Sequence, residues 1–276
     1  MEKIKERVIE AFGREWEHFN QHPLDATERA RIFHDYFNIF PWSRLPSSGG
    51  IGADIGCGSG RWAAVVAPRV EYLHLVDASA SALNVAAEAT KTLSNVAYLQ
   101  SDVTRLPFAD GTLDFAYSLG VLHHVPDTIG AVIEIARKLK RGAPLLLYLY
   151  YRFDNRPKWY RNLWWASDTI RKVVSRLPFR LRLIISTVIA TSVYWPLAKI
   201  ARIGERRGRN VGEWPLSYYR DKSFYTMRTD SLDRLGTELE QRFTREEVRN
   251  MMLRAGMDEI QFSDRPPYWV VVGMKQ

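Results

Sequence analysis

The sequence has almost no cysteine. Cys57 is the single one among 276 residues, so the chain cannot form an intramolecular disulfide bond. With 46% apolar residues, the chain is long enough to bury a substantial core without one. This cysteine usage is typical of a reducing compartment. The first residues, Met-Glu-Lys-Ile-Lys-Glu-Arg, lack the apolar stretch of a secretory signal peptide. We therefore expect a cytoplasmic protein.

Long apolar runs are also scarce. An uncharged apolar run extends from Leu183 to Leu197 and is interrupted by Pro196. It is shorter than the roughly 20 residues that a membrane-spanning helix requires, so we expect no such helix. There is no internal repeat and no low-complexity tract, which excludes a repeat architecture.

Acidic residues are rare in one segment. Between Arg152 and Arg209 the sequence has fourteen Lys and Arg but three acidic residues, a net charge of +11. The whole chain carries +8, so the remainder carries −3. The basic character therefore belongs to this segment, which is where an anionic partner is expected.

One glycine is missing from a glycine-rich loop. Residues 51–60 read IGADIGCGSG, with glycines in the pattern G-x-G-x-G after a short apolar strand. A loop that cradles the pyrophosphate of a dinucleotide reads G-x-G-x-x-G, whereas position 61 here is Arg. Glycines at this density indicate a tight turn or the close approach of a ligand. The expected ligand is therefore not a dinucleotide.

Strand and helix patterns alternate from residue 51 to residue 150 and resume near the end of the chain. The expected strands are 53–55, 71–76, 96–99, 113–119, 144–150, 259–263 and 268–273. Helices are expected after the capping residues Ser79, Asp127 or Thr128, and Thr244. This order predicts an α/β fold with a Rossmann-like, doubly wound sheet of seven strands, the last antiparallel.

Three regions follow from this reading. Residues 1–46 are helical and aromatic and are expected to form an N-terminal lid. Residues 47–150 and 244–276 would form the core. Residues 151–243 would be a basic, aromatic, helical insertion between the fifth strand and the last helix.

Acidic residues stand where two expected strands end. In such a sheet, ligands bind beyond the carboxyl ends of the strands. Asp77 ends the second strand, where a carboxylate can accept both hydroxyls of a ribose. Asp102 follows the third strand and could accept from an exocyclic amine, with Val103 packing beside a ring. Together with the glycine loop, these residues predict a site for a nucleoside that lacks a polyphosphate.

These motifs resemble, in order and position, those of the class I S-adenosylmethionine-dependent methyltransferases, specifically the type 11/25-like bacterial small-molecule group. The resemblance covers residues 50–150. The motifs are Asp54-Ile-Gly-Cys-Gly-Ser-Gly60, Asp77, Asp102-Val-Thr-Arg-Leu-Pro-Phe108 and Asp114-Phe-Ala-Tyr-Ser-Leu-Gly-Val-Leu-His-His124.

The resemblance implies S-adenosylmethionine as methyl donor, S-adenosylhomocysteine as product and no metal. Gly56 and Gly58 would face the methionine part, Asp77 the ribose and Asp102 the adenine, with Asp54 supporting the loop. The cofactor-binding residues that it implies are Asp54, Gly56, Cys57, Gly58, Gly60, Asp77, Ala78, Asp102, Val103 and Leu119.

Two histidines follow the fourth strand, beside the expected sulfonium. Methyl transfer is an in-line displacement, in which an enzyme mainly aligns two atoms. A hydroxyl or ammonium acceptor also needs a base that works near neutral pH, a role that suits histidine. Phosphoethanolamine N-methyltransferases are similar here, with a histidine at the end of this strand. We predict His123 as the catalytic base and His124 as pocket lining; a structural role for either stays open.

Further acceptor-site candidates come from resemblance to related bacterial methyltransferases. Residues 227–243 are rich in charge and lack helical periodicity, which is typical of a solvated loop. The candidates there are Asp230, Asp233, Arg234 and Arg242. In the N-terminal region, Trp16 or Tyr36 is expected to close over the cofactor.

The basic segment has three interpretations. It is a helical lid with a solvated basic face, an interfacial helix pair that docks on anionic lipid or holds an anionic acceptor, or an RNA-binding surface. Aliphatic residues among the cations count against RNA. Asp264-Arg-Pro-Pro-Tyr268 resembles the D/N-P-P-Y motif of nucleic-acid amino-methyltransferases, but it stands in the terminal hairpin, so we expect a turn there.

The sequence thus predicts a methyltransferase that acts on an oxygen or nitrogen of a small-molecule, lipid-linked or glycan-linked acceptor. One rival is a non-catalytic module that binds S-adenosylmethionine or its product and is tethered by the basic segment. Another is an RNA-directed methyltransferase. In the interfacial interpretation the protein is peripheral at the inner face of the membrane. The acceptor and the oligomeric state stay open.

Overall fold

The computed structural model describes residues 2–21 and 23–276, with side chains from residue 6 onward. The chain divides into two compact units. We call residues 1–22, 31–152 and 239–276 the sheet unit, and residues 23–30 and 153–238 the helical unit. The insertion expected at 151–243 overlaps the helical unit, whereas the lid expected at 1–46 is divided between both units.

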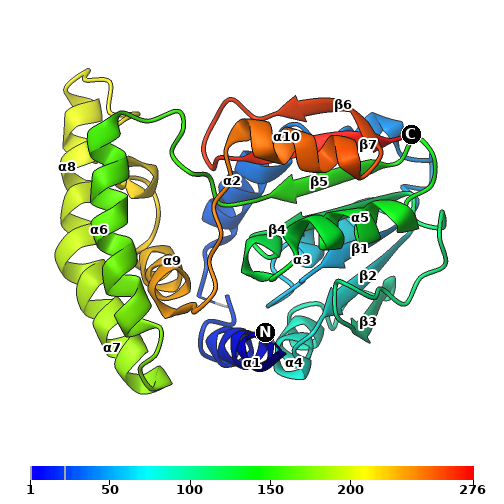
Figure 1. Ribbon diagram of the computed structural model, residues 1–276, viewed down its shortest axis with the longest axis horizontal. Coiled ribbons are helices and arrows are strands. Elements are labelled where there is room, and N and C mark those ends of the chain that lie inside the picture. Colours follow the sequence, from blue (N-terminus) through cyan, green and yellow to red (C-terminus); the bar gives the residue numbers. More distant parts are fainter. Residues whose placement is uncertain (1, 22) are drawn as a thin grey trace. The chain divides into compact units, whose positions relative to one another are not determined.

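The sheet unit is built on seven strands in the order β3-β2-β1-β4-β5-β7-β6 (Figure 1). They are β1 (Ile51–Ile55), β2 (Tyr72–Asp77), β3 (Val96–Gln100), β4 (Phe115–Leu119), β5 (Pro144–Tyr148), β6 (Met257–Phe262) and β7 (Val270–Lys275). The first five pair in parallel, and β7 runs antiparallel to both β5 and β6. The predicted fold class is confirmed. The strand order reverses between β1 and β4, which is where a ligand site is expected.

The helix starts predicted from capping residues are also confirmed. The helices of this unit are α1 (Glu2–His18), α2 (Ala26–Phe37, which begins in the helical unit), α3 (Ala63–Val66), α4 (Ala80–Ala89), α5 (Thr128–Lys138) and α10 (Arg245–Arg254). Ser79 caps α4, and Asp127 caps α5. Thr244 and Glu247 form a reciprocal capping box at the start of α10.

Successive residues of β5 enter opposite sides of the core, because side chains alternate along a strand. Leu145 and Leu147 belong to the apolar cluster that contains α5 and α10. Leu146 and Tyr148 belong to the cluster that contains α3 and α4. All five residues of β5 are buried, as expected for a strand covered on both faces. The sheet is thereby fixed, and its strand ends become a rigid base for a site.

The helical unit consists of α6 (Lys158–Val174), α7 (Phe179–Ile189), a π-helical turn (Ala190–Tyr194), α8 (Trp195–Arg206) and α9 (Phe224–Gly236). Helix α7, the π-helical turn and α8 form one continuous helix, Phe179–Arg206, of 28 residues. By length and composition alone this helix could cross a membrane, so the expectation that no helix here is long enough to span one is wrong. The π turn is the reason. The amide of Trp195 bonds to Ala190 five residues back, and Pro196 follows at the start of α8.

The charge-rich stretch expected to be a solvated loop is instead largely helical. Residues 224–236 form α9, which starts at the cap Ser223. Met227 and Leu232 are buried, and so are the polar residues Thr229 and Ser231. Helical periodicity was absent from the sequence because the buried face of α9 carries hydroxyl groups as well as apolar side chains.

Candidate cofactor and acceptor site

The glycine loop leaves β1 in a conformation that few other residues adopt. Gly56, Gly58 and Gly60 have φ angles of 76°, 53° and 71°. The amides of Gly56 and Cys57 bond to the carbonyl of Val76 at 2.7 and 3.0 Å, so the end of β2 holds the loop. A Cβ atom at Gly58 would lie 2.8 Å from the ring of Trp16. The loop therefore turns tightly and lets a ring approach its backbone.

Asp77 connects this loop to the site. One oxygen accepts from the amide of Gly58 at 3.0 Å, and the other accepts from the amide of Ser79 at 2.9 Å. Burial raises the pKa of Asp77, while these backbone hydrogen bonds oppose the increase. Each carboxylate oxygen has two lone pairs, so each can still accept a bond from a ligand hydroxyl.

Asp102 lies beyond β3 and is held by its own turn. Its Oδ1 accepts from both the amide and the hydroxyl of Thr104 at 2.8 Å. One edge of the sheet therefore brings together four groups (Figure 1). They are the glycine loop after β1, Asp77 at the end of β2, Asp102 after β3 and the residues after β4. This is the arrangement predicted from the sequence.

One cavity unites these groups within the sheet unit. It holds about 1030 Å³ of empty space, including the solvent at its open mouth. Its lining includes ten of the predicted site residues: Trp16, Gly56, Cys57, Gly58, Asp77, Ala78, Asp102, Val103, Leu119 and His124. The predicted residues Tyr36, Asp54, Gly60, His123 and Arg242 do not line it.

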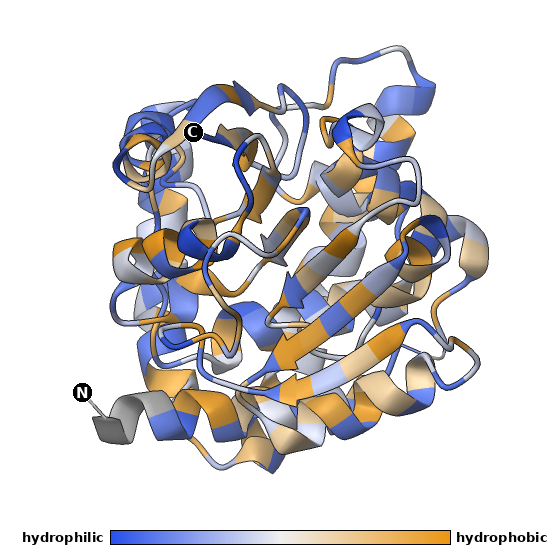
Figure 2. Ribbon diagram, turned by 90° about the vertical axis from the view of Figure 1, so that its right-hand side faces the viewer, coloured by the Kyte–Doolittle hydropathy of each residue, from blue (hydrophilic) through white to orange (hydrophobic). Residues whose placement is uncertain are grey.

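Helix α1 supplies lining that sequence reasoning largely missed. Val8, Ile9, Phe12 and Trp16 all face the cavity. In Figure 2, the helix that starts at the N-terminus carries hydrophilic and hydrophobic residues in alternating bands. Residues 8, 12 and 16 recur every four positions, and this helical spacing is the signal that could have identified Val8.

Asp54 and Gly60 act behind the cavity. Asp54 is buried in β1, opposite Tyr117 of β4 in the strand register. Burial raises the pKa of Asp54 to about 8, the nearby Tyr117 hydroxyl lowers it, and the charge of Asp77 raises it further. A Cβ atom at Gly60 would lie 3.0 Å from the backbone of Ala86, so Gly60 permits α4 to pack on the loop.

Cys57 lines the cavity but is not an activated thiol. Burial raises its pKa well above the ordinary value, and the carboxylates of Asp77 and Asp54 raise it further. A cysteine nucleophile requires the opposite shift. Within the described residues, no cluster of three His, Cys, Asp or Glu side chains could hold a metal ion.

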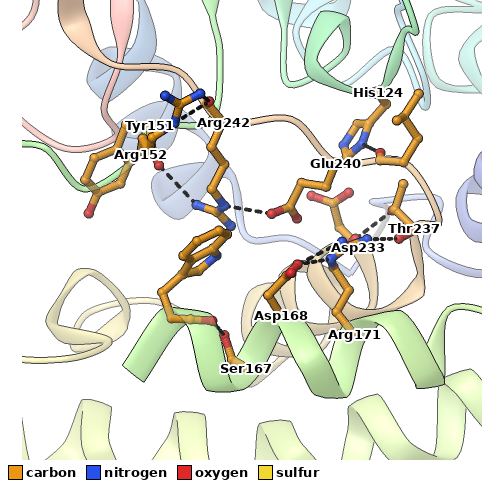
Figure 3. Close-up of polar contacts among 12 residues, drawn as sticks. His124, Tyr151, Arg152, Ser167, Asp168, Arg171, Asp233, Thr237, Glu240 and Arg242 are labelled. Atoms are coloured by element: carbon orange, nitrogen blue, oxygen red, sulfur yellow. Dashed lines mark hydrogen bonds and ion pairs between the residues drawn. The ribbon is translucent and has the colours of Figure 1, made fainter. Parts of the chain in front are cut away.

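The two histidines lie in a 3-10 turn, Leu122–His124, and have different surroundings. His124 lines the cavity, with its ring 4.9 Å from that of Phe12. Its Nδ1 lies 2.6 Å from the carbonyl oxygen of Leu239 (Figure 3). Because a carbonyl can only accept, Nδ1 carries a proton, and Nε2 is the ring nitrogen that can accept one.

His123 lies behind the cavity. It is fully buried and stacks on Tyr150 with 3.8 Å between ring centroids. Neither of its ring nitrogens has a hydrogen-bond partner among the described residues. Burial lowers its pKa well below the ordinary value, and the charges of His124 and Arg242 lower it further. The base predicted from the sequence is therefore placed away from the cavity, and its neighbour faces it.

Arg242 holds the backbone beside these histidines. It bonds to Glu240 at 2.7 Å (Figure 3). Its guanidinium lies over the ring of Tyr150. Arg152 donates to the carbonyl of Arg242 at 2.9 Å and also bonds to Glu247. These contacts fix residues 240–243 against the end of β5.

The remaining acceptor-site candidates belong to the helical unit. Asp230 on α9 accepts from the hydroxyl of Tyr219 at 2.7 Å, and Arg234 lies over the same ring. Burial raises the pKa of Tyr219. The neighbouring Asp233 accepts through its backbone carbonyl from the hydroxyl of Thr237. In the helical unit, Asp230 and Arg234 therefore belong to a buried polar cluster around Tyr219.

Residues 53–147 match the family model of the methyltransferase domain. The chain is 35% identical over 100 residues to the uncharacterized methyltransferase YcgJ of Bacillus subtilis, covering 36% of this chain and 40% of that protein. It is 36% identical over 93 residues to demethylmenaquinone methyltransferase of Staphylococcus carnosus, covering 32% and 38%. The chain spans about two fifths of the length of these relatives.

Residues 53–147 are a methyltransferase domain of the class I, S-adenosylmethionine-dependent type. Solved methyltransferases share its fold. A putative S-adenosylmethionine-dependent methyltransferase of Methanococcus maripaludis matches with a TM-score of 0.54 at 15% identity, covering 96% of this chain and 92% of that one. Human N-acetylserotonin methyltransferase in complex with S-adenosylmethionine matches with 0.52 at 14%, covering 88% and 51%.

S-adenosylmethionine is the cofactor of this domain type, and the groups that line the cavity fit it. Asp77 offers a carboxylate for the ribose hydroxyls, and Asp102 offers one for the adenine amine. Gly56 and Gly58 lack a Cβ, and the side chains of Val121 and Trp16 lie 2.5 and 2.8 Å from where those atoms would be. The loop and these two side chains together form one wall of the cavity.

Proposed function

We propose that this protein transfers the methyl group of S-adenosylmethionine to an oxygen or nitrogen of a small-molecule or lipid-linked acceptor. The observation that carries the proposal is that His124, with its Nε2 as acceptor, lines the same cavity as the glycine loop, Asp77 and Asp102. Donor-binding groups and a base thus share one space, which a methyl transfer requires.

The bound donor supplies an electrophilic methyl group on a sulfonium. The acceptor's lone pair forms the new bond to the methyl carbon while the carbon–sulfur bond breaks, which leaves S-adenosylhomocysteine. Nε2 of His124 takes the proton that the acceptor oxygen or nitrogen loses. The carbonyl of Leu239 holds the Nδ1 proton in place, so that Nε2 remains the basic atom.

Apolar walls support the same proposal. Trp16 of α1 lies against Gly58, and Phe12 lies against His124, so both exclude water from the proposed transfer. The proposed acceptor is therefore a group that enters this partly apolar space through the open mouth, and not a base held within a nucleic-acid duplex.

The decisive experiment incubates the full chain and a cell extract with S-adenosylmethionine that carries a radiolabelled methyl group. The extract is then separated into lipid, glycan, small-molecule, RNA and protein fractions. We expect label in the lipid, glycan or small-molecule fraction. Label in RNA alone would instead identify an RNA-directed methyltransferase.

Calorimetry with S-adenosylmethionine and S-adenosylhomocysteine completes this experiment. We expect both to bind. Binding without transfer to any fraction would favour a non-catalytic module, and absence of binding to both would exclude the proposed function.

A further inference from the structure

We propose that the helical unit docks on the surface of an anionic membrane through the outward faces of α6 and of the helix Phe179–Arg206. This inference concerns a surface that the proposed methyl transfer does not use.

Helix α6 is amphipathic in the opposite sense to an ordinary surface helix. Its packed face carries Asp168 and Arg171, which form an ion pair with 2.8 Å between N and O. Arg171 also donates to the carbonyl of Thr237 at 2.7 Å. An ordinary helix buries apolar residues and exposes charged ones. Because α6 buries an ion pair, we infer that its exposed side chains are covered by something outside the helical unit.

The exposed face of α6 is apolar. Leu163, Ile170 and Val173 recur at intervals of seven and three residues and so share one face of the helix. Val173 is 64% exposed, and Trp165 beside this face is 70% exposed. Each of these side chains would lose contact with water if a second surface covered the face.

The helix Phe179–Arg206 repeats this pattern. Leu181, Ile184 and Val188 are exposed at intervals of three and four residues. Its opposite side is packed within the helical unit, where the carbonyl of Ser186 accepts from the hydroxyl of Ser231. Helix α9 packs against α6 and α7, as can be followed in Figure 1.

The apolar exposure is concentrated here. Of sixteen exposed large apolar side chains among the described residues, twelve lie on α6 or on the helix Phe179–Arg206. These are Trp159, Leu163, Trp165, Ile170, Val173, Leu181, Ile184, Val188, Val193, Trp195, Ile200 and Ile203. Such a concentration of exposed apolar side chains on two helices is typical of an interaction surface.

Charge decides which partner fits. Exposed cations stand where the apolar faces begin and end: Lys158 and Arg161, then Lys172, Arg176 and Arg180, then Arg206, Arg207 and Arg209. Three acidic residues accompany the fourteen Lys and Arg of residues 152–209. Apolar side chains flanked by cations and by Trp match the boundary between acyl chains and anionic headgroups. A nucleic-acid groove would instead place the cations at its centre.

Docking on the surface fits better than crossing the bilayer. The helix Phe179–Arg206 is long and apolar enough to span, but one of its sides packs on α9, where the hydroxyl of Ser231 donates to the carbonyl of Ser186. Its Arg182 donates to the carbonyl of Gly236 at 2.7 Å. A surface-bound helix keeps this contact, whereas a spanning helix would bring Arg182 into the membrane or break the packing with α9.

The test is co-sedimentation of the full chain with vesicles. One set contains phosphatidylcholine alone, and the other adds one third phosphatidylglycerol. We expect at least about tenfold tighter binding to the anionic vesicles, with a marked loss as salt rises from 0.05 to 0.5 M, because exposed charges are screened. Equal binding to both vesicles, or binding to neither, would overturn the proposal.

Substitutions locate the surface. The double variants Val173→Glu/Val188→Glu and Arg176→Glu/Arg180→Glu change exposed side chains and should each reduce binding at least about tenfold. The matched control is Ile133→Glu/Leu253→Glu, which alters two exposed apolar residues of the sheet unit and should leave binding unchanged. Circular dichroism verifies that every variant is folded. Unchanged binding of the first two variants would contradict the proposed surface.

Two further readouts separate the alternatives. Sodium carbonate at high pH should release the protein from membranes, and retention would show a spanning helix instead. Light scattering should give the same mass for the native chain and Val173→Glu/Val188→Glu, and a dimer lost in the variant would assign the face to a second copy. S-adenosylmethionine affinity of each variant, measured by calorimetry, distinguishes a failure of docking from a failure of the proposed function.

Discussion

Two adjacent histidines, His123 and His124, differ more than their sequence suggests. They lie in a 3-10 turn, in which successive side chains point about 120° apart. One ring consequently stacks on Tyr150 in the core, and the other faces the cavity. The sequence correctly placed the pair at a strand end. It could not show which ring faces the cavity, because the rotation of the turn depends on the packing of Leu122 and on the carbonyl of Leu239.

His124 is the residue whose loss should affect chemistry. We expect His124→Ala to lower kcat by about 10²-fold, the usual scale for removing a general base, while the affinity for S-adenosylmethionine stays within about threefold. Steady-state kinetics and calorimetry measure the two quantities. His34→Ala, which removes an exposed histidine of α2, is the control. A variant that retains full kcat would exclude His124 as the base.

Asp54 should make stability depend on pH. Its pKa is about 8 in the folded protein and about 4 in the unfolded chain, so the folded protein holds a proton that the unfolded chain has lost. The contribution of Asp54 to the free energy of unfolding is therefore greatest below pH 4 and falls as pH rises to 8. Relative to Asp54→Asn, we expect the native chain to lose about 4 kcal/mol of unfolding free energy between pH 5 and pH 8.

Urea denaturation at the two pH values measures this difference. The variant keeps the shape of the side chain but cannot titrate, so the comparison cancels the contributions of all other groups. Parallel pH dependence of the native chain and the variant would show that Asp54 is ionised in the folded protein.

At the scale of elements, α1 turns an edge of the sheet into a cavity. The glycine loop and the two aspartates are held by strands, but Phe12 and Trp16 reach them from a helix at the start of the chain. The strand ends could be predicted because each depends on local patterns. The packing of α1 on α4 could not be predicted, because it depends on contacts between residues that lie far apart in the sequence.

Trp16 should contribute to binding of the donor. Its ring lies over Gly58, so Trp16→Ala opens the loop to water and removes an aromatic wall. We expect about tenfold weaker binding of S-adenosylmethionine, with Trp16→Phe restoring most of the affinity. Calorimetry measures both variants. Equal affinity of the native chain and Trp16→Ala would show that α1 does not contact the ligand.

The insertion shows where local patterns fail. The uncharged run of Leu183 to Leu197 was too short to predict a spanning helix, but a π turn immediately before Pro196 lets one helix run from Phe179 to Arg206. On α9, hydroxyl groups of Thr229 and Ser231 take up positions of the buried face and bond to carbonyl groups. Both outcomes follow from packing within the helical unit, which periodicity in a short window does not describe.

At the scale of the whole molecule, the two units carry different chemistry. The sheet unit contains both apolar clusters of the sheet and the complete lining of the cavity. The helical unit has a small cluster of its own around Tyr194, Tyr219 and Met227. Most of the basic segment also lies there, with a net charge that the remainder of the chain does not share. Donor binding and membrane docking should therefore be separable.

A deletion tests this separation. The chain leaves the sheet unit after Arg152 and re-enters it at Leu239, and the amide of Arg152 bonds to the carbonyl of Phe243 at 2.9 Å. The two connections are thus paired within the sheet unit, and a short Gly/Ser linker can replace residues 153–238. We expect this variant to unfold cooperatively and to bind S-adenosylmethionine within about tenfold of the native affinity, because every residue that lines the cavity remains.

The same variant should lose both binding to anionic vesicles and transfer of the radiolabelled methyl group, since the docking face and the candidates Asp230 and Arg234 are absent. Calorimetry, co-sedimentation and the transfer assay give three independent values. Retained vesicle binding would assign docking to the sheet unit. This result is not expected, because the chain outside residues 152–209 carries a net charge of −3 and would not be attracted to an anionic membrane. Lost cofactor binding in a folded variant would show that donor recognition requires the helical unit, and the separation of roles argued from the two cores would then be wrong.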